Sequence, residues 1–291
     1  MSAMLLYFED EQAAAQRFAK AAGLNAQVVQ RHRFPDGELK LTLPTPLTAQ
    51  VVIYRSLVDP NEKLVELMFV AQSARGLGAT TITLVCPYLA YMRQDIAFHP
   101  GEVVSQKVAG KFLAGLFDGV ITVDPHLHRV ATLEEAVPVK RAVVVSGAPM
   151  LGDWIAAHVR NAFLLGPDGE SAQWVAQAAA KYGLDHAACE KVRHGDKSVD
   201  ISLPDVKLAG RHVVLVDDVA SSGRTLALAA KLALDAGASS VDVAVTHALF
   251  AQDALQVIKA AGVRHIWSTD CIAHDSNVIE IAETLAQAYL S

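Results

Sequence analysis

Short runs of β-branched and aliphatic residues alternate along this chain with longer stretches in which apolar residues recur at helical spacing. In the first half, residues 80–88 and 118–126 have the continuous apolar pattern of buried strands. Residues 64–78, in contrast, carry an apolar stripe at helical spacing and end in glycines. Such alternation of strand and helix is typical of βαβ units. It predicts an α/β fold built on mainly parallel sheets.

A second series of strand-like segments follows the first. Its members are residues 141–146, 161–168, 211–218, 239–250 and 263–270, separated by Ala-rich helical stretches near Trp174, Leu228 and Ala254. A chain of 291 residues is longer than one compact core usually organises. We therefore expect two tandem α/β domains, residues 1–142 and 143–276, each with a mainly parallel sheet flanked by helices, although no linker marks the boundary.

The last segment, residues 277–291, has apolar residues near helical spacing. Asn277 is a candidate N-cap, and Glu280 follows it at the spacing of a capping box. We expect a helix here that packs back on the first domain.

Composition narrows the class of protein. Hydrophobic residues make up 52% of the chain and charged residues 19%, which is typical of a folded protein with large cores. The net charge of -6 disfavours nucleic-acid binding but permits a local basic pocket for an anionic small molecule. Scattered cysteines, the lack of a membrane-length apolar run and the lack of a signal-peptide pattern favour a cytoplasmic protein that binds no membrane.

The segment VVLVDDVASSGRTL, residues 213–226, carries the most specific chemical signal. An apolar strand ends in Asp217 and Asp218, and small hydroxyl residues and a glycine then precede a helix-like stretch. In open α/β sheets ligands bind beyond the carboxyl ends of strands, and N–H groups at a helix start suit phosphate. The two carboxylates are suited to sugar hydroxyls, directly or through a divalent cation. The pattern predicts a sugar-phosphate site, although a single such Asp would serve equally well as a helix cap.

This segment resembles the ribose-5-phosphate loop of the phosphoribosyltransferase superfamily. Four further segments resemble, in order, those of ribose-phosphate pyrophosphokinases: RFPDGELKL (33–41), YLAYMRQD (88–95), GEVVSQKVAGKFL (101–113) and ITVDPH (121–126). The resemblance spans nearly the whole chain. It implies two tandem phosphoribosyltransferase-like domains, with the nucleotide bound by the first and ribose 5-phosphate by the second.

The resemblance also implies a reaction. The anomeric hydroxyl of ribose 5-phosphate attacks the β-phosphorus of ATP, giving phosphoribosyl pyrophosphate and AMP. Such transfers depend on alignment and on charge neutralisation, for which Mg²⁺ is the expected cofactor. A homo-oligomer, either a dimer or a multiple of dimers, is the expected assembly.

Particular residues acquire roles from the resemblance. Contacts to ribose 5-phosphate fall to Asp217, Asp218, Ser221, Ser222, Gly223, Arg224 and Thr225. Contacts to ATP fall to Phe34, Asp36 and Glu38 in a Pro-Asp-Gly turn, and to Arg93, Gln94 and Asp95. Arginine is well suited to bidentate phosphate contact. Taken alone, the Pro-Asp-Gly sequence is equally typical of a plain hairpin turn.

Mg²⁺ coordination is expected from Asp124 and His126, an Asp-x-His at a predicted strand end, and from Asp168 after a later strand. Alternate residues of a strand project to the same side, which would bring Asp124 and His126 together. A lone histidine is also common as a structural residue. The resemblance makes Lys191 and Arg193 the catalytic cations, although the same pattern fits a solvated basic loop.

The sequence departs from the family pattern at several positions. Glu170 and Ser171 replace the more common glycine pair after Asp168, and Ser221 stands where many members carry a third Asp. Three alternatives therefore stay open: a phosphoribosyltransferase that consumes the product, the same chemistry on another sugar phosphate, and a catalytically silent regulatory homologue.

Overall fold

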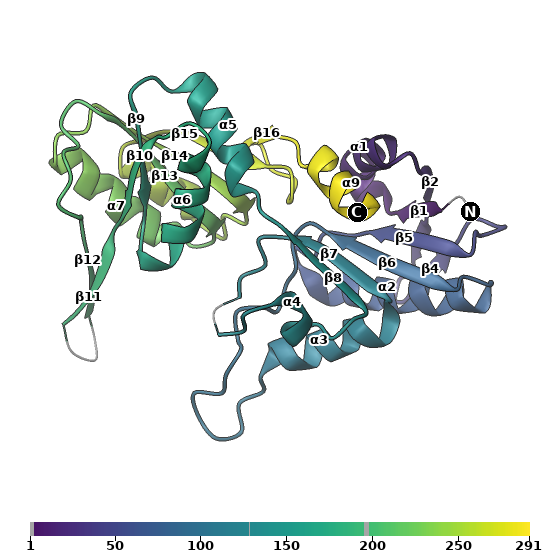
Figure 1. Cartoon of the computed structure of the whole chain (residues 1–291). Coiled ribbons are helices and arrows are strands. Elements are labelled where there is room, and N and C mark those ends of the chain that lie inside the picture. Colours follow the sequence, from purple (N-terminus) through teal and green to yellow (C-terminus); the bar gives the residue numbers. More distant parts are fainter. Residues whose placement is uncertain (1–2, 128, 195–197) are drawn as a thin grey trace. The chain divides into compact units, whose positions relative to one another are not determined.

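The computed structural model describes residues 3–127, 129–194 and 198–291; for residues 191–194 and 198–200 it describes the backbone alone. The chain divides into two compact units, the first formed by Met1–Val145 with Ala282–Ser291 and the second by Ser146–Ile281 (Figure 1). Each is a mainly parallel sheet flanked by helices, so the predicted α/β fold with two tandem domains is confirmed.

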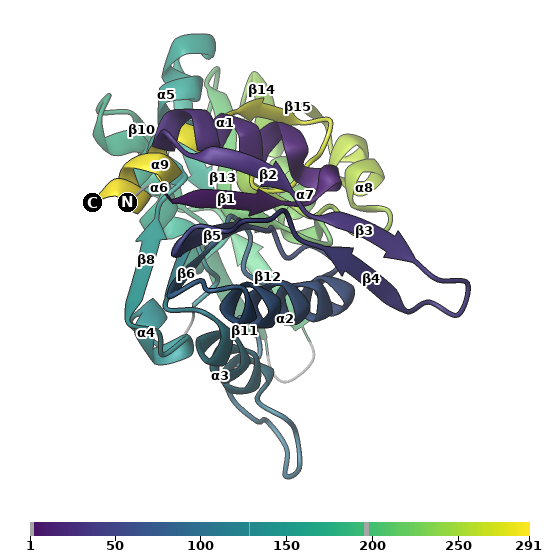
Figure 2. The same ribbon diagram turned by 90° about the vertical axis from the view of Figure 1, so that its right-hand side faces the viewer.

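The first unit is built on a parallel sheet in the order β2-β1-β5-β6-β7-β8. Its strands are β1 (Met4–Tyr7), β2 (Asn25–Val28), β5 (Gln50–Tyr54), β6 (Thr81–Cys86), β7 (Gly119–Val123) and β8 (Arg141–Val145). Its helices are α1 (Gln12–Ala22), α2 (Pro60–Gly76), α3 (Ser105–Leu116), α4 (Leu133–Ala136) and α9 (Ala282–Leu290), with a short 3-10 turn, η1 (Glu9–Glu11). Helices α2 and α3 cover one face of the sheet and α1 and α9 the other (Figure 2).

The second unit repeats this design with the sheet order β10-β9-β13-β14-β15-β16. Its strands are β9 (Ala162–Gly166), β10 (Asp185–Ala188), β13 (His212–Ala220), β14 (Ser240–Ala248), β15 (Val263–Thr269) and β16 (Asn277–Ile279). The 3-10 turn η2 (Gly169–Ser171) follows β9, and the helices are α5 (Ala148–His158), α6 (Ala172–Ala180), α7 (Arg224–Asp235) and α8 (Ala254–Ala260). The run Val213–Val216 is fully buried, as a strand covered on both faces requires.

Both units insert an antiparallel hairpin at the same point, after the second strand. In the first unit it is β3 (Gln30–Arg33) with β4 (Leu39–Thr42), and in the second β11 (Glu190–His194) with β12 (Ser198–Ser202). In both sheets the order reverses beside the first strand, between β1 and β5 and between β9 and β13. The carboxyl edge at such a switch point is where open α/β sheets bind ligands.

Two segments differ from their sequence-based assignment. Residues 141–146 were expected to open the second series, but β8 is instead the edge strand of the first sheet and pairs with β7. Residues 277–291 were expected to form one helix, but Asn277–Ile279 is strand β16, and the helix begins at Ala282. Short apolar segments fit either periodicity, and the available strand partner decides between them.

Asn277 accordingly does not cap a helix. Its side-chain amide donates to Ser268 Oγ at 2.9 Å and to Thr269 O at 2.7 Å, which fastens β16 to the end of β15. Helix α9 packs against α1 within the first unit, where Tyr289 meets the Phe18 ring edge-on at 6.1 Å.

The three cysteines are free thiols and are buried. Among the helices in the described part of the chain, none combines the length and the apolar character that crossing a membrane requires.

Candidate active site

A pocket of about 230 Å³ opens in the first unit among the loops that follow β6 and β7. It brings together three residues that the sequence predicted for the nucleotide and the metal, namely Arg93, Gln94 and His126. The two loops meet because β6 and β7 are neighbours in the sheet. The remaining lining residues, to which the sequence analysis assigned no role, are Tyr88, Leu89, Tyr91, Met92 and Ser105. Two of them are the tyrosines of the YLAYMRQD segment.

The start of α3 holds the pocket loop in place. Gln106 is buried, and its side-chain amide donates to Met92 O at 3.1 Å while its backbone N–H donates to Gln94 O at 3.2 Å. Asp95 does not line the pocket. It is buried and accepts a hydrogen bond from Arg129 Nη1 at 2.7 Å, so the structure gives it an anchoring contact beside the loop.

Asp124 and His126 lie beyond the end of the strand, so strand alternation does not decide whether their side chains project to one side. Strand β7 ends at Val123, and Asp124 has a left-handed backbone with φ 34°. The chain turns there, so side chains two residues apart need not project to one side. Asp124 is buried, with its N–H donating to Val145 O at 2.9 Å, whereas His126 is half-buried and lines the pocket. A ligand role for Asp124 stays a prediction.

The Pro-Asp-Gly segment forms the turn of the β3–β4 hairpin, which projects beyond the sheet of the first unit (Figure 2). Phe34 N donates to Glu38 O at 2.8 Å, and Asp36 Oδ1 accepts from Glu38 N at 3.2 Å. All three side chains are exposed, including the 40% exposed ring of Phe34, and none of them lines the 230 Å³ pocket. Their predicted contact with the nucleotide therefore stays untested.

In the second unit, β13 extends to Ala220, so the two aspartates lie within the last residues of the strand rather than after it. Asp218 is buried, and its N–H donates to Asp217 Oδ1 at 3.0 Å. Helix α7 follows with Gly223 as its N-cap, and among the described residues no side chain caps its first turn. The first N–H groups of a helix lack intrahelical partners, so they are suited to a phosphate.

The loop between β13 and α7 is fastened by a neighbouring loop. Phe250 N donates to Ala220 O at 2.8 Å, and Ala251 N donates to Ser221 O at 3.0 Å. Gly223 has φ +71°, and a Cβ atom there would lie 2.8 Å from Ile258 Cδ1. Glycine is therefore required both by the left-handed backbone and by the close approach to α8.

Asp168 follows β9, the strand that pairs with β13 on the other side of the switch point. Its carboxylate accepts from Glu170 N at 3.0 Å and from Ser171 N at 3.3 Å, and the Ser171 hydroxyl interacts with the Asp168 backbone in return. Ser171 is fully buried. The departure from the family's glycine pair thus provides a capping box that defines this loop.

The carboxylates of the second unit influence one another. Burial raises the pKa of Asp217 well above its usual value, and the neighbouring charges of Asp218 and Asp168 raise it further, against a lowering hydrogen bond from the Asp218 N–H. Hydroxyl donors or a divalent cation would relieve this repulsion. In the described part of the chain, no three His, Cys, Asp or Glu residues form a ready metal cluster.

Lys191 and Arg193 both lie on β11, opposite Ile201 and Val199 of β12. Their side chains lie outside the described residues, so their catalytic role stays a prediction.

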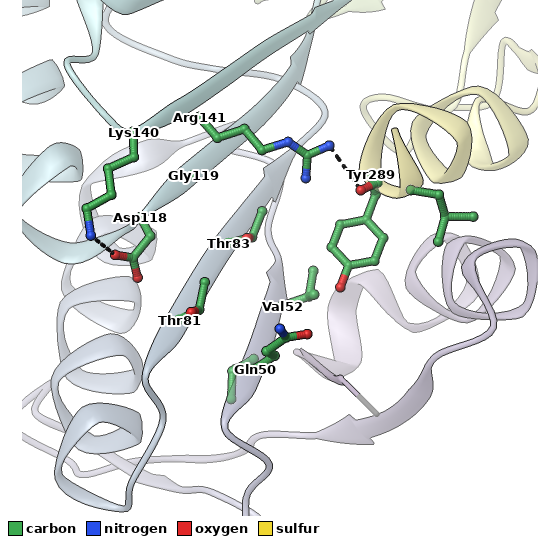
Figure 3. A pocket seen from close by; sticks show the side chains of 11 residues that line it. Gln50, Val52, Thr81, Thr83, Asp118, Gly119, Lys140, Arg141 and Tyr289 are labelled. Carbon is green, nitrogen blue, oxygen red and sulfur yellow. Dashed lines mark hydrogen bonds and ion pairs between the residues drawn. The ribbon is translucent and has the colours of Figure 1, made fainter. Parts of the chain in front are cut away.

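A second cavity of about 450 Å³ lies at the opposite, amino edge of the first sheet (Figure 3). Arg141 and Tyr289 line it, as does the ion pair between Lys140 and Asp118. None of the predicted site residues is among its lining residues. The smaller pocket at the carboxyl edge is therefore the better candidate for the active site.

Comparisons with known proteins find relatives that match both units of the chain. A family model described as the N-terminal domain of ribose phosphate pyrophosphokinase matches residues 3–116, and one described as a phosphoribosyl transferase domain matches residues 151–284. The ribose-phosphate pyrophosphokinase of Methanopyrus kandleri is 33% identical over 276 residues, covering 94% of this chain and 93% of its own. That of Halobacterium salinarum is 32% identical over 288 residues, covering 98% and 100%.

The crystal structure of phosphoribosylpyrophosphate synthetase from Mycobacterium smegmatis superposes with a TM-score of 0.84, covering 99% of this chain and 97% of that one. At 20% identity this match shows the shared fold. The family-level conclusion comes from the sequence relatives, whose similarity runs through both units. The chain belongs to the ribose-phosphate pyrophosphokinase family.

Proposed function

We propose that this protein transfers the β,γ-pyrophosphoryl group of ATP to the anomeric hydroxyl of ribose 5-phosphate, giving phosphoribosyl pyrophosphate and AMP. Relatives that carry the name ribose-phosphate pyrophosphokinase match it over nearly its full length, which supports the proposal. The observation that carries it is the pocket in which Arg93 and Gln94 of one predicted segment meet His126 of another.

The first unit would bind the nucleotide. Arg93 lines the pocket, and its planar guanidinium is suited to two parallel hydrogen bonds with phosphate oxygens. Gln94 offers an amide that can both donate to and accept from a base. Phe34, Asp36 and Glu38 would add contacts to adenine from the hairpin turn, where their exposure leaves them accessible.

The second unit would bind the sugar. The phosphate of ribose 5-phosphate would lie against the N–H groups of Ser221 to Thr225, where the positive end of the α7 dipole favours an anion. Asp217 and Asp218 would accept hydrogen bonds from the vicinal hydroxyls. The raised pKa of Asp217 supports this role, because hydroxyl donors stabilise the ionised form that its neighbours disfavour.

Mg²⁺ is the proposed cofactor, and the protein offers it a few carboxylates and a histidine rather than a complete set of ligands. Magnesium keeps several waters and is often held by one or two carboxylates plus substrate phosphates, which agrees with the lack of a ready cluster among the described residues. His126, Asp124 and Asp168 are the candidates to hold it. When bound, the ion would neutralise part of the triphosphate charge.

Lys191 and Arg193 would supply positive charge to the pyrophosphoryl group as it moves. Preorganised cations act most strongly where charge develops in the transition state, so they lower the barrier rather than strengthen substrate binding. We further propose a homo-oligomer that acts in the cytoplasm, for which the buried free thiols are suited to a reducing compartment.

The direct test is to incubate the purified protein with ATP, Mg²⁺ and ribose 5-phosphate and to identify the products by mass spectrometry. We expect AMP and phosphoribosyl pyrophosphate in equal amounts, and neither in a control without the sugar. Formation of ADP with a doubly phosphorylated sugar would contradict the proposed transfer. A requirement for a nucleobase would instead indicate a phosphoribosyltransferase, and binding without turnover a silent homologue.

A further inference from the structure

A cluster of charged side chains fills the carboxyl edge of the first sheet where the strand order reverses, between β1 and β5. We call it the Arg55 network; its six members are Asp10, Glu11, Arg31, Arg55, Lys63 and Glu66. Its three cations match its three carboxylates. Arg55 and Glu66 are 1% and 0% exposed, so the centre of the network is removed from water.

Arg55 is the hub. Its Nη1 donates to Asp10 Oδ2 at 2.8 Å and to Glu11 Oε2 at 3.2 Å, and its Nη2 pairs with Glu66 Oε2. The guanidinium also lies 4.4 Å from the centre of the Phe8 ring. Removing one member of a buried ion pair leaves an uncompensated charge, so the geometry of this network is strongly constrained.

The network reaches the β3–β4 hairpin through one carboxylate. Glu66 on α2 binds Arg55 with one oxygen and accepts from Arg31 Nη1 on β3 with the other, at 2.6 Å. One helical turn earlier, Glu62 pairs with Arg33, also on β3. Two Arg–Glu pairs therefore join helix α2 to strand β3 of the hairpin that carries Phe34.

The network also reaches the pocket loop. Glu11 Oε1 accepts from Ser56 N at 2.8 Å, and Lys63 Nζ donates to Ser56 O at 2.7 Å. The next residue, Leu57, donates its N–H to Tyr88 O at 2.8 Å, and Tyr88 lines the 230 Å³ pocket. The same six charges thus contact both the hairpin base and the segment that leads into the pocket.

We infer that the Arg55 network is a positioning device that holds the hairpin turn and the pocket loop in the orientations that nucleotide binding requires of each. Its side chains occupy the switch point of the sheet, and the 230 Å³ pocket lies instead at the ends of β6 and β7. Arg31 is the positioning residue that transmits this orientation to the hairpin. The inference rests on the proposed nucleotide site of the first unit.

The experiment compares two arginines that have the same local chemistry but lie at opposite edges of the sheet. Arg31 is 33% exposed and pairs with Glu66 at 2.6 Å; Arg75 is 35% exposed and pairs with Asp118 at 2.5 Å. Each is replaced by Met, which keeps the apolar stem and removes the charge. We expect Arg31→Met to raise the KM for ATP about tenfold, with kcat and the KM for ribose 5-phosphate nearly unchanged. Arg75→Met should alter none of the three.

Two further measurements separate positioning from folding. Arg31→Lys, which restores a charge opposite Glu66, should recover most of the affinity for ATP. In a double-mutant cycle with Phe34→Ala, Arg31→Met should have little additional effect, because both changes would act through the hairpin. Melting temperatures of Arg31→Met and Arg75→Met should fall by similar amounts.

Equal shifts in the KM for ATP in the two Met variants, or no shift in Arg31→Met, would overturn the inference while leaving the proposed reaction intact. Failure of the wild-type protein to form phosphoribosyl pyrophosphate would overturn the proposed reaction instead. In that case the binding constant of a non-hydrolysable ATP analogue, measured by calorimetry on the same variants, still tests the positioning role. An unchanged constant in Arg31→Met would then contradict it.

Discussion

Arg55 and Asp217 occupy the same position in the two similarly ordered sheets and carry opposite charges. Arg55 lies two residues beyond Ile53, the last residue of β5 that pairs with β1; Asp217 lies two residues beyond Leu215, the last residue of β13 that pairs with β9. Carboxylates neutralise Arg55, whereas burial and the like charges of Asp218 and Asp168 raise the pKa of Asp217. The charge of Arg55 is therefore compensated within the protein, whereas the charge of Asp217 could be stabilised by hydroxyl groups or a cation of a ligand.

Replacing Asp217 with Asn should stabilise the protein and abolish binding of ribose 5-phosphate. The folded-state pKa of Asp217 is raised, so folding at neutral pH must either bury an ionised carboxylate or take up a proton, and both cost folding free energy. That cost shrinks as the pH falls below the raised pKa and disappears below the pKa of the unfolded chain. We expect Asp217→Asn to raise the free energy of unfolding by on the order of 1 kcal/mol near neutral pH, and Tm by about 2–4 °C.

Thermal melts of both proteins over a series of pH values check this prediction. The advantage of the variant should shrink as the medium becomes more acidic, and calorimetry should show no heat on addition of ribose 5-phosphate. A variant that is less stable than the wild type at neutral pH would contradict the electrostatic account.

Gly223→Ala should disturb the phosphate loop more than its backbone angle alone implies. Gly210 offers a matched control, since its φ of +73° is nearly the same as the +71° of Gly223, but a Cβ there would meet nothing within 4 Å. Both changes carry the cost of a left-handed alanine, roughly 1 kcal/mol. Overpacking against α8 should lower the free energy of unfolding of Gly223→Ala by about 1–3 kcal/mol more.

Urea unfolding measures the stability of the two variants, and the KM for ribose 5-phosphate measures how well the phosphate loop still binds its substrate. We expect a large increase in this KM for Gly223→Ala and none for Gly210→Ala. Equal behaviour of the two variants would show that the contact with Ile258 does not shape the site.

Lys191→Ala should lower kcat about 10²-fold with modest changes in both KM values, because a cation beside the transferred group acts chiefly in the transition state. Lys181→Ala is the control, since Lys181 is an exposed lysine that pairs with Asp153. Steady-state kinetics with both substrates distinguish the outcomes. Unchanged turnover in Lys191→Ala would remove this residue from the mechanism.

Asp118 should contribute to stability in an acid-sensitive manner. Burial alone would raise its pKa, but hydrogen bonds from Arg75, the Ile82 N–H and Lys140 outweigh burial and lower the pKa to about 2. The contribution is present above the unfolded value of 3.8 and is lost as the pH falls to about 2. Asp118→Asn should therefore lower the free energy of unfolding by about 1–2 kcal/mol at neutral pH and leave it unchanged once the pH is below the lowered pKa.

Chemical denaturation at several pH values tests this difference. Asp153→Asn serves as the comparison: its carboxylate is 45% exposed, so solvent screens its pair with Lys181 and the change should cost less than about 0.5 kcal/mol. A pH-independent cost for Asp118→Asn would contradict the assignment.

The sequence by itself determined the features that are local along the chain. Continuous apolar runs such as Val213–Val216 identify strands buried on both faces, and their position before Asp217 places the carboxylates at a ligand-binding edge. The Pro-Asp-Gly turn and the glycine before α7 are likewise readable, because turn geometry depends on adjacent residues.

Tertiary structure alone decided which distant residues meet. Strand β8 joins the first sheet through β7, and Asn277 fastens a strand instead of capping a helix. The Arg55 network had no signature in the sequence, since Arg55 lies 45 positions from Asp10 and 11 from Glu66. A buried charge is tolerated only where folding brings its counter-charges within hydrogen-bond distance, and that condition depends on strand order rather than on any local pattern.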